Sequence, residues 1–192
     1  MVEISVQDET AIQNLLVAFQ DETNAQAKYL AFAAQADAEQ MHGAASLCRA
    51  AAWSEHIHAS SHARAIKQLG VEPWGALQQV EVKNTLANMK NALEGEQHEI
   101  DHMYPEVLEE ARKHRNKTVI RAFVGALESE KVHARLYAEA VALIESGKKD
   151  SWIGAAREFF VCPVCGYTSK THDEDESCPV CSCSQERFEA IR

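Results

Sequence analysis

Glycine and proline are scarce in this chain, whose 192 residues include only 8 glycines and 4 prolines. Both residues interrupt regular structure. Between about residues 8 and 147 their scarcity leaves long stretches dominated by Ala, Glu, Gln, Lys and Leu, which have high helix propensity. Apolar residues recur there at spacings of three and four, the period of an amphipathic helix. This part of the chain is therefore predicted to be helical throughout.

Long apolar segments are also missing. No apolar run approaches the roughly 20 residues of a membrane-spanning helix, so no membrane contact is expected. The first nine residues have neither the basic nor the apolar segment of a secretory signal. We therefore expect a cytoplasmic protein, in a compartment that keeps thiols reduced.

Basic residues are few relative to acidic ones. Lys and Arg number 19 against 29 Asp and Glu, which gives a formal net charge of −10. Binding to nucleic acid requires a basic face, so nucleic acid is not expected as a partner. A Gly-x-Gly-x-x-Gly motif is absent too, which leaves no apparent nicotinamide site. Reducing equivalents should therefore come from a separate protein.

Turn residues divide the helical region into four segments. We expect helices at residues 8–38, from the 41–43 turn to about residue 69, at 85–115 and at 117–146. Residues 71–84, which include Pro73 and Gly75, form a longer crossover between the second and third helices. Short, long and short connections predict an all-α, ferritin-like four-helix bundle with one long crossover.

Four of the six cysteines form two Cys-x-x-Cys pairs near the end of the chain. Cys162 and Cys165 make the first pair, and Cys178 and Cys181 make the second after a spacer of 12 residues. Four thiolates on two tight turns give the tetrahedral geometry that suits zinc or a single iron ion. The spacing favours Cys181 over its neighbour Cys183 as the fourth ligand.

These cysteines belong to a separate small region. We predict a helical bundle at residues 1–147, a linker at 148–158 and a metal-knuckle β domain at 159–192. Such a domain has almost no core of its own and depends on its metal to fold. A zinc ion there would only stabilise the fold, whereas an iron ion would also carry one electron. Cys48, within the second helix, is interpreted as a buried thiol.

Each predicted helix carries a glutamate at mid-length on its apolar face. These residues are Glu22, Glu55, Glu96 and Glu130. An ionised carboxylate in a core costs several kcal/mol unless it is paired or metal-bound, and four converging carboxylates would repel one another. Buried ion pairs are the alternative, but basic partners are missing from these faces. The pattern therefore predicts metal cations between the helices.

Two of these glutamates begin a Glu-x-x-His motif, which places an imidazole one turn along the same side of the helix. The motifs are Glu55-x-x-His58 and Glu130-x-x-His133. One Glu from each of two helices and Glu-x-x-His from each of the other two form the ligand set of a carboxylate-bridged dinuclear site. This mixture of oxygen and nitrogen favours iron or manganese.

An internal repeat sets these two motifs apart from the Glu-x-x-His sequences at residues 39–42 and 99–102. The first glutamate of the set precedes the second by 33 residues, and the third precedes the fourth by 34. His62 lies one turn beyond His58 on the same face. We interpret it as a packing residue or as a neighbour of the metal ligands.

The chain as a whole resembles rubrerythrin, in which a ferritin-like di-iron domain precedes a rubredoxin-like iron–tetracysteine domain. The motifs that carry the resemblance are Glu22-x-x-Ala25-x-x-x-Tyr29, Glu55-x-x-His58, Gly95-Glu96-x-x-Glu99-x-x-x-x-Tyr104, Glu130-x-x-His133 and the two Cys-Pro-x-Cys knuckles. Glu99 is the most discriminating residue, because ferritin-like proteins in general need only one glutamate on this helix.

The resemblance implies a role for each metal ligand. Glu55 and Glu130 would bridge two irons. Glu22 and Glu96 would be terminal ligands, and His133 would bind one of the two irons. Manganese or zinc can substitute at such a site. The tetracysteine site would hold one iron, or zinc in its place.

The resemblance also implies which residues take part in catalysis. Glu99 and His58 would exchange as ligands to one iron, with the carboxylate bound in the oxidised state and the imidazole in the reduced state. Two ferrous ions carry less charge than two ferric ions and tolerate a neutral ligand in place of one acid. Tyr29 and Tyr104 would lie beside the ligands and donate hydrogen bonds to them; ordinary packing in the bundle is their alternative role.

Rubrerythrins reduce hydrogen peroxide to water at the diferrous centre, and the rubredoxin-like iron resupplies the electrons one at a time. The resemblance thus implies a non-haem di-iron peroxidase of the oxidative-stress response. Its electrons would come from an external reductase or rubredoxin. A homodimer or higher homo-oligomer is implied as well, because head-to-tail dimers of the family bring the rubredoxin-like iron of one subunit near the dinuclear site of another.

Two other functions remain open at this level. One is a ferritin-like ferroxidase or iron-handling protein with a structural zinc knuckle, and the other is a binding scaffold that docks through a zinc ribbon. Glu99 and the tetrathiolate favour the peroxidase, because iron storage needs no electron-delivery module. Both zinc and iron accept four thiolates, so the knuckles alone leave the metal open.

Overall fold

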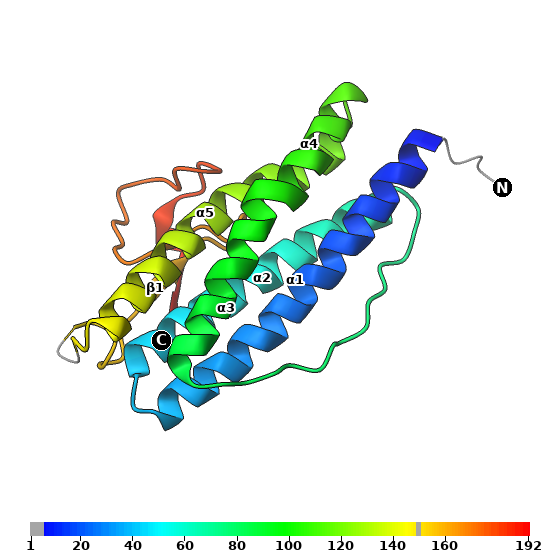
Figure 1. The fold of residues 1–192 in the computed structure, drawn as a ribbon. Helices are drawn as coiled ribbons and strands as arrows, with labels where there is room; N and C mark the ends of the chain where they lie inside the picture. Colours follow the sequence, from blue (N-terminus) through cyan, green and yellow to red (C-terminus); the bar gives the residue numbers. More distant parts are fainter. Residues whose placement is uncertain (1–5, 149–150) are drawn as a thin grey trace.

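The computed structural model describes residues 6–148 and 151–192. Four long helical rods form a bundle, and a small sheet follows at the C-terminal end (Figure 1). The rods are α1 (Val6–Ala38), α2 (His42–Gln68), α3 (Thr85–His98) with its continuation through the π-helical turn η1 (Glu99–Met103) and α4 (Tyr104–Lys113), and α5 (Lys117–Glu145). The predicted ferritin-like bundle is confirmed. Residues 1–5 of the predicted bundle and residues 149–150 of the predicted linker lie outside the described residues.

Two asparagines mark where helices begin. The Asn84 side chain accepts a hydrogen bond from the Ala87 amide at the start of α3, and Asn116 accepts one from the Val119 amide at the start of α5. Each bond satisfies an amide that has no partner within its own helix. These caps account for the agreement between the predicted and observed helix starts at residues 85 and 117.

The crossover between α2 and α3 runs along α1 without regular structure (Figure 1). Gln20 of α1 both donates to and accepts from the Ala76 backbone, at 2.5 and 2.6 Å. One turn farther along α1, Asn24 accepts from the Gln78 amide at 2.9 Å. Two amide side chains therefore hold the crossover against the bundle by its backbone.

The apolar core of the bundle is divided into two clusters. One contains residues from the second half of α1 and α5 and the first half of α2, with Phe32, Leu47 and Leu136 among them. The other contains residues from the opposite ends of these helices, including Leu15 and Phe123. Glu22, Glu96 and Glu130 come from the sequence between the two clusters, and Glu55 lies at the edge of the first. The packing therefore leaves a polar layer near mid-bundle.

The third rod differs from the predicted continuous helix at residues 85–115. The turn η1 contains one wide π-helical turn, and buried positions on either side, Glu96 and Tyr104, are eight residues apart. Ile100 and Met103, which the helical period places inward, are half-buried. Pro105 lies two residues after the end of this turn, and its missing amide removes one α-helical hydrogen bond. Such wide turns are frequent at functional sites.

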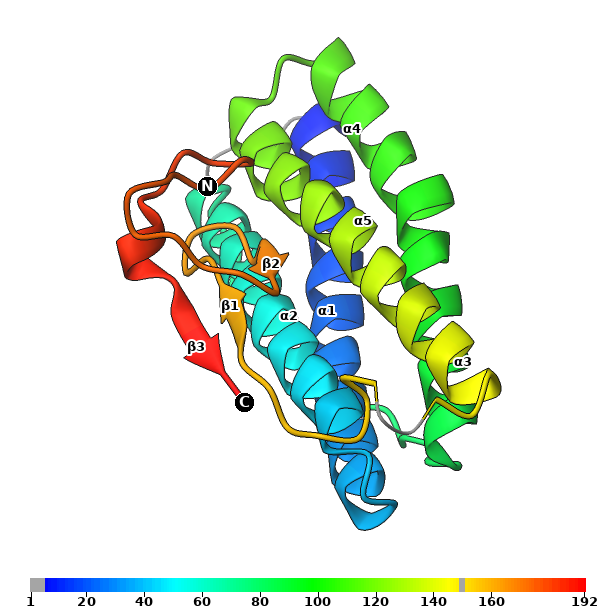
Figure 2. The ribbon, with the colours of Figure 1, turned by 90° about the vertical axis from the view of Figure 1, so that its left-hand side faces the viewer.

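The C-terminal module is a three-stranded antiparallel sheet in the order β2-β1-β3. Its elements are β1 (Phe159–Val161), β2 (Thr168–Ser169), the short helix η2 (Gln185–Arg187) and β3 (Glu189–Ile191). The module lies beside α2 and α5 of the same chain (Figure 2). Across the part of the chain that the structure describes, no helix is both long and apolar enough to cross a membrane.

Candidate metal centres

Four glutamates, one from each rod of the bundle, converge in the layer between the two apolar clusters. Glu22, Glu55, Glu96 and Glu130 each expose 1% or less of their surface. Burial to this degree is rare for glutamate unless the carboxylate has a partner of opposite charge. No lysine or arginine forms an ion pair with these carboxylates among the described residues; the basic groups that face them are the imidazoles of His58, His62 and His133.

The ligand atoms fall into two groups of four, and within each group they lie within 4.8 Å of one another. The first group is Glu22, Glu55, His58 and Glu130, and the second is Glu55, Glu96, Glu130 and His133. Two residues, Glu55 and Glu130, belong to both groups. A carboxylate has two oxygens, so each of these residues can offer one oxygen to each of two neighbouring cations.

Both histidines turn the same ring nitrogen toward the carboxylates. His58 Nδ1 lies 2.8 Å from Glu130 Oε1 and 2.9 Å from Glu55 Oε2. His133 Nδ1 lies 2.7 Å from Glu130 Oε2 and 3.5 Å from Glu55 Oε1. Each imidazole can therefore complete one of the two groups.

Two buried tyrosines hold the outer carboxylates. Tyr29 donates to Glu96 Oε1 at 2.7 Å, and Tyr104 donates to Glu22 Oε1. The other oxygen of each carboxylate, Glu22 Oε2 and Glu96 Oε2, is buried without a hydrogen-bond partner. A buried acceptor without a donor is costly, and a cation beside it would satisfy it. These open oxygens and the set of carboxylates and imidazoles fit a dinuclear iron or manganese site.

In the protein without metal, protons compensate the buried carboxylates. Burial, together with repulsion from Glu130 and Glu22, raises the pKa of Glu55 to about 7. Burial and the charges of Glu130 and Glu55 hold the pKa of Glu96 well above its usual range. These acids carry protons near neutral pH, and a metal ion must displace them.

The histidines bind protons for the opposite reason. Burial by itself would lower the pKa of His58, but the nearby carboxylates of Glu130 and Glu22 raise it well above the ordinary value. The pKa of His133 is raised in the same way by Glu130 and Glu96. Both imidazoles are thus charged in the metal-free site and must become neutral to ligate a cation.

Glu99 lies at the start of η1 and belongs to neither group of four. Its side chain is half-buried and lines a cavity of about 680 Å³ between α1, α3 and residues 78–83, together with Lys28 and Gly95. Burial and the charges of Glu22 and Glu130 raise its pKa well above the usual range. Glu99 therefore stands between this cavity and the buried carboxylates.

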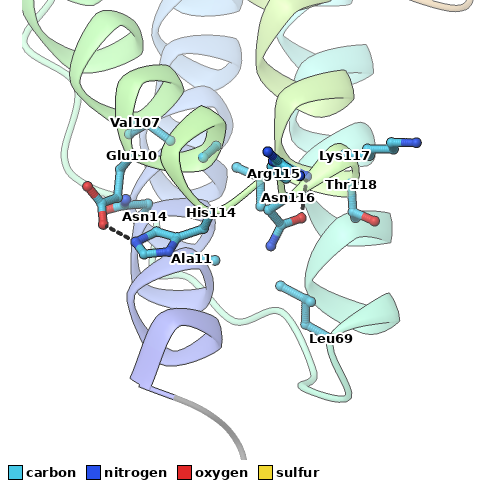
Figure 3. Close-up of a pocket in the computed structure, with 12 residues that line it drawn as sticks. Ala11, Asn14, Leu69, Val107, Glu110, His114, Arg115, Asn116, Lys117 and Thr118 are labelled. Carbon is cyan, nitrogen blue, oxygen red and sulfur yellow. Dashed lines mark hydrogen bonds and ion pairs between the residues drawn. The ribbon is translucent and has the colours of Figure 1, made fainter.

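A second cavity, of about 440 Å³, lies at the end of the bundle (Figure 3). His114, Asn116 and Lys117 are among its lining residues, and His114 pairs with Glu110 at 2.8 Å. None of the residues predicted to bind metal lines it, so it is separate from the candidate metal centres.

The four predicted thiolate ligands come together in the C-terminal module. The sulfurs of Cys162, Cys165, Cys178 and Cys181 lie within 4.8 Å of one another, and all the cysteines are free of disulfides. Cys183 lies outside this group and contacts the Ser184 carbonyl instead. Cys48 is buried in the bundle, where burial raises the pKa of its thiol to about 12.

The module touches the outer side of the dinuclear centre. His58 Nε2 lies 3.1 Å from the Cys165 carbonyl oxygen, and Ser129 donates to the same oxygen at 2.9 Å. Ser54 donates to the Gly166 carbonyl at 2.7 Å. Neither serine was predicted from the sequence, although the repeat contains both: each of the two ligand motifs is preceded by a serine, as Ser-Glu-x-x-His.

The surroundings of His62 fit both interpretations made from the sequence, a packing residue and a neighbour of the predicted metal ligands. It is fully buried, neither ring nitrogen has a hydrogen-bond partner, and its Nε2 lies 3.6 Å from Glu22 Oε1. Its ring packs against Phe123 with the centroids 4.6 Å apart. The structure thus places a third imidazole beside the carboxylates.

Comparisons with known proteins agree with this arrangement. The sequence model of the Rubrerythrin family matches residues 13–141. Rubrerythrin-2 of Clostridium acetobutylicum is 37% identical over 153 residues, which cover 76% of this chain and 77% of that protein. Nigerythrin of Nitratidesulfovibrio vulgaris is 32% identical over 103 residues, 54% of this chain and 47% of that protein. A solved structure of fully reduced, all-ferrous nigerythrin superimposes with a TM-score of 0.82 at 30% identity, covering 94% of this chain and 86% of that one.

Proposed function

Because this chain belongs to the rubrerythrin family, we propose that it is a non-haem di-iron peroxidase that reduces hydrogen peroxide to water. The observation that carries the proposal is the pair of four-ligand groups that share Glu55 and Glu130, placed between an open cavity and a tetracysteine module. The all-ferrous state of the nigerythrin structure supports iron as the metal.

The two groups support a division of roles among the ligands. Glu55 and Glu130 would bridge the metals, since both groups include them. Glu22 and Glu96 would be terminal ligands through their unpartnered oxygens. His133 would complete the group that contains Glu96. Glu99 and His58 would alternate at the other metal, and the present geometry has His58 within the group and Glu99 outside it.

Reduction of one hydrogen peroxide to two waters consumes two electrons and two protons. Two ferrous ions, when bound, supply both electrons at once, so the O–O bond is cleaved without a free radical. The chain supplies the surroundings: Tyr29 and Tyr104 hold Glu96 and Glu22 in place by hydrogen bonds. The cavity that Glu99 lines gives peroxide a route from solvent, and Glu99 is the predicted metal ligand that lies on this cavity.

The contact between the module and the bundle supports electron transfer between the two metal sites. Cys165 would be a ligand of the tetracysteine iron, and its own carbonyl oxygen lies 3.1 Å from His58 Nε2. The family resemblance places this approach between two subunits, whereas this structure forms it within one chain. A homo-oligomer stays a prediction, and the relay between the sites does not depend on it. The electrons would enter from an external reductase or rubredoxin.

The test is a stopped-flow experiment on the iron-loaded protein. The protein is reduced without oxygen and mixed with one hydrogen peroxide per dinuclear site, while the visible absorption of the ferric–thiolate site is recorded. We expect this absorption to return rapidly, and much faster than with dissolved oxygen. Peroxide oxidises the dinuclear site, and the tetracysteine iron then reduces that site and itself becomes ferric.

Other outcomes point to the other functions. A colour that returns slowly, or faster with oxygen than with peroxide, favours a ferroxidase or iron-handling protein. Iron in the bundle with no ferric–thiolate colour at any stage means that the knuckles hold zinc, and the electron relay is then wrong.

A further inference from the structure

The structure assigns a positioning role to Thr168, a residue of the C-terminal module: we propose that its hydroxyl orients the metal ligand His133. Thr168 lies on β2 and is fully buried, and its Oγ1 is 3.1 Å from His133 Nε2. The inference rests on the function proposed above, in which His133 binds metal. It extends that function by making one module side chain part of the support of the dinuclear centre.

The hydrogen bonds around Thr168 determine which atom donates. Its Oγ1 lies 3.1 Å from the Gly166 carbonyl oxygen, which can only accept. The hydroxyl proton therefore points to Gly166, and the hydroxyl lone pairs face the imidazole. It follows that Nε2 of His133 carries a proton, so Nδ1, which faces Glu130 and its neighbours, is the nitrogen left to bind a metal. That tautomer can ligate a metal on the carboxylate side.

His58 is supported in the same manner, but by a different kind of acceptor. Its Nε2 faces the carbonyl oxygen of Cys165, a backbone group that any residue at position 165 would supply. His133 instead depends on a side chain. A substitution at Thr168 can therefore remove the hydrogen bond that orients His133 without removing the one that orients His58.

The neighbouring contacts make Thr168→Val a selective change. Gly166 O keeps the hydrogen bond from Ser54, at 2.7 Å, when the threonine hydroxyl is removed. Cys165 O keeps its bond from Ser129, at 2.9 Å. The group left without a partner is His133 Nε2–H, a buried donor. The module should stay docked while His133 loses its orientation and part of its basicity, and loss of such an outer hydrogen bond typically weakens metal binding by roughly 10- to 100-fold.

The experiment uses the full chain with zinc in the knuckles and Mn²⁺ as the probe for the bundle, since a hard cation avoids thiolates and prefers carboxylates. The EPR signal of free Mn²⁺ gives the affinity. We expect Thr168→Val and Thr168→Ala to weaken Mn²⁺ binding by roughly 10-fold or more. Thr168→Ser keeps the hydroxyl group and should bind Mn²⁺ like the unsubstituted protein. The exposed hydroxyl of Thr171 provides the control, and Thr171→Val should leave the affinity unchanged.

A second measurement reads the hydrogen bond itself. In the protein with zinc in both sites, NMR of ¹⁵N-labelled histidine should show a His133 Nε2 proton that exchanges slowly with solvent, and this protection should be lost in Thr168→Val and Thr168→Ala. Unchanged Mn²⁺ affinity and unchanged protection in these variants would overturn the inference while the proposed function stands. If the unsubstituted protein takes up no Mn²⁺ and no iron in the bundle, the dinuclear site itself is wrong and the inference is overturned with it.

Discussion

Single residues decide whether the bundle can hold two cations. Glu55 and Glu130 are the only members of both four-ligand groups in the described part of the chain, and both are buried. Replacing either carboxylate by the amide of the same shape removes a negative charge that both metal positions share and replaces one of the two ligand oxygens by an NH2 group. The effect should therefore reach both positions, unlike a change at Glu22 or Glu96.

We expect Glu130→Gln to abolish dinuclear metal binding and to spare the metal of the four cysteines. Elemental analysis of metal per chain measures both at once. Glu128→Gln is the matched control, because Glu128 lies two residues away on the same helix and is exposed beside Lys131. Two metal ions retained in the bundle of Glu130→Gln would contradict the bridging role.

Glu99 should affect turnover more than metal content, because it lies outside both groups. We expect Glu99→Gln to keep most of the bound metal and to slow oxidation of the reduced protein by peroxide, by about 10²-fold, the size of effect usual for a positioned carboxyl group in catalysis. Single-turnover stopped-flow kinetics measure this. Glu94 lines the same cavity and is exposed, so Glu94→Gln should react like the unsubstituted protein; equal rates for both variants would make Glu99 an ordinary surface acid.

At the scale of elements, the knuckle between β1 and β2 and the face of α2 have to approach closely. Gly166 makes this possible. Its φ is +79°, a conformation that favours glycine, and a Cβ at this position would overlap His58 Nε2 and Ser54 Oγ. The close approach is what allows the Cys165 carbonyl to reach His58. At this contact the backbone carbonyls of the knuckle thus meet the polar side chains of Ser54 and His58 of α2 and Ser129 of α5.

Gly166→Ala should undock the knuckle from α2. The left-handed conformation alone costs about 1–2 kcal/mol for a residue with a Cβ, and the overlap with α2 adds to it. Gly70→Ala separates the two effects, because Gly70 has a similar φ of +81° and open space around it. We expect a larger fall in thermal stability and faster proteolysis of the segment before β1 for Gly166→Ala than for Gly70→Ala. Equal changes in the two variants would mean that the docking contact contributes nothing.

At the scale of the whole molecule, the metal-free bundle compensates its buried acids with protons. The carboxyl groups of Glu55 and Glu96 and the imidazoles of His58 and His133 all have a raised pKa. A raised pKa means that the proton persists to higher pH, so protons and metal compete over the neutral range. Assembly of the centre is therefore coupled to the release of protons by these four groups.

Metal affinity should rise with pH between about 6 and 8. Each proton released on binding contributes about a tenfold change in affinity for each pH unit, and Glu55, with a pKa of about 7, titrates within this window. Mn²⁺ titrations at several pH values, with calorimetry in buffers of different ionisation enthalpy, measure the slope and the number of protons released. An affinity that is independent of pH over this range would contradict the protonation of the metal-free site.

The sequence alone predicted much of this protein because its signals are local and periodic. The helical period, the scarcity of glycine and proline and the turn residues between the segments were enough to predict the four rods. The Glu-x-x-His motifs and Cys-x-x-Cys pairs identified residues that the structure brings together, since a helix or a tight turn sets the spacing between ligands on the same element.

Contacts between elements were decided only by the tertiary structure. The π-helical turn at Glu99 shifts the helical period within the third rod, and neither the apolar spacing nor Pro105 was enough to predict that shift. The docking of Cys165, Gly166 and Thr168 onto α2 and α5 depends on backbone carbonyls and small hydroxyl groups, which have no characteristic pattern in a sequence. Local chemistry therefore determined which residues could bind metal, and long-range packing decided that the two metal sites of one chain lie in contact.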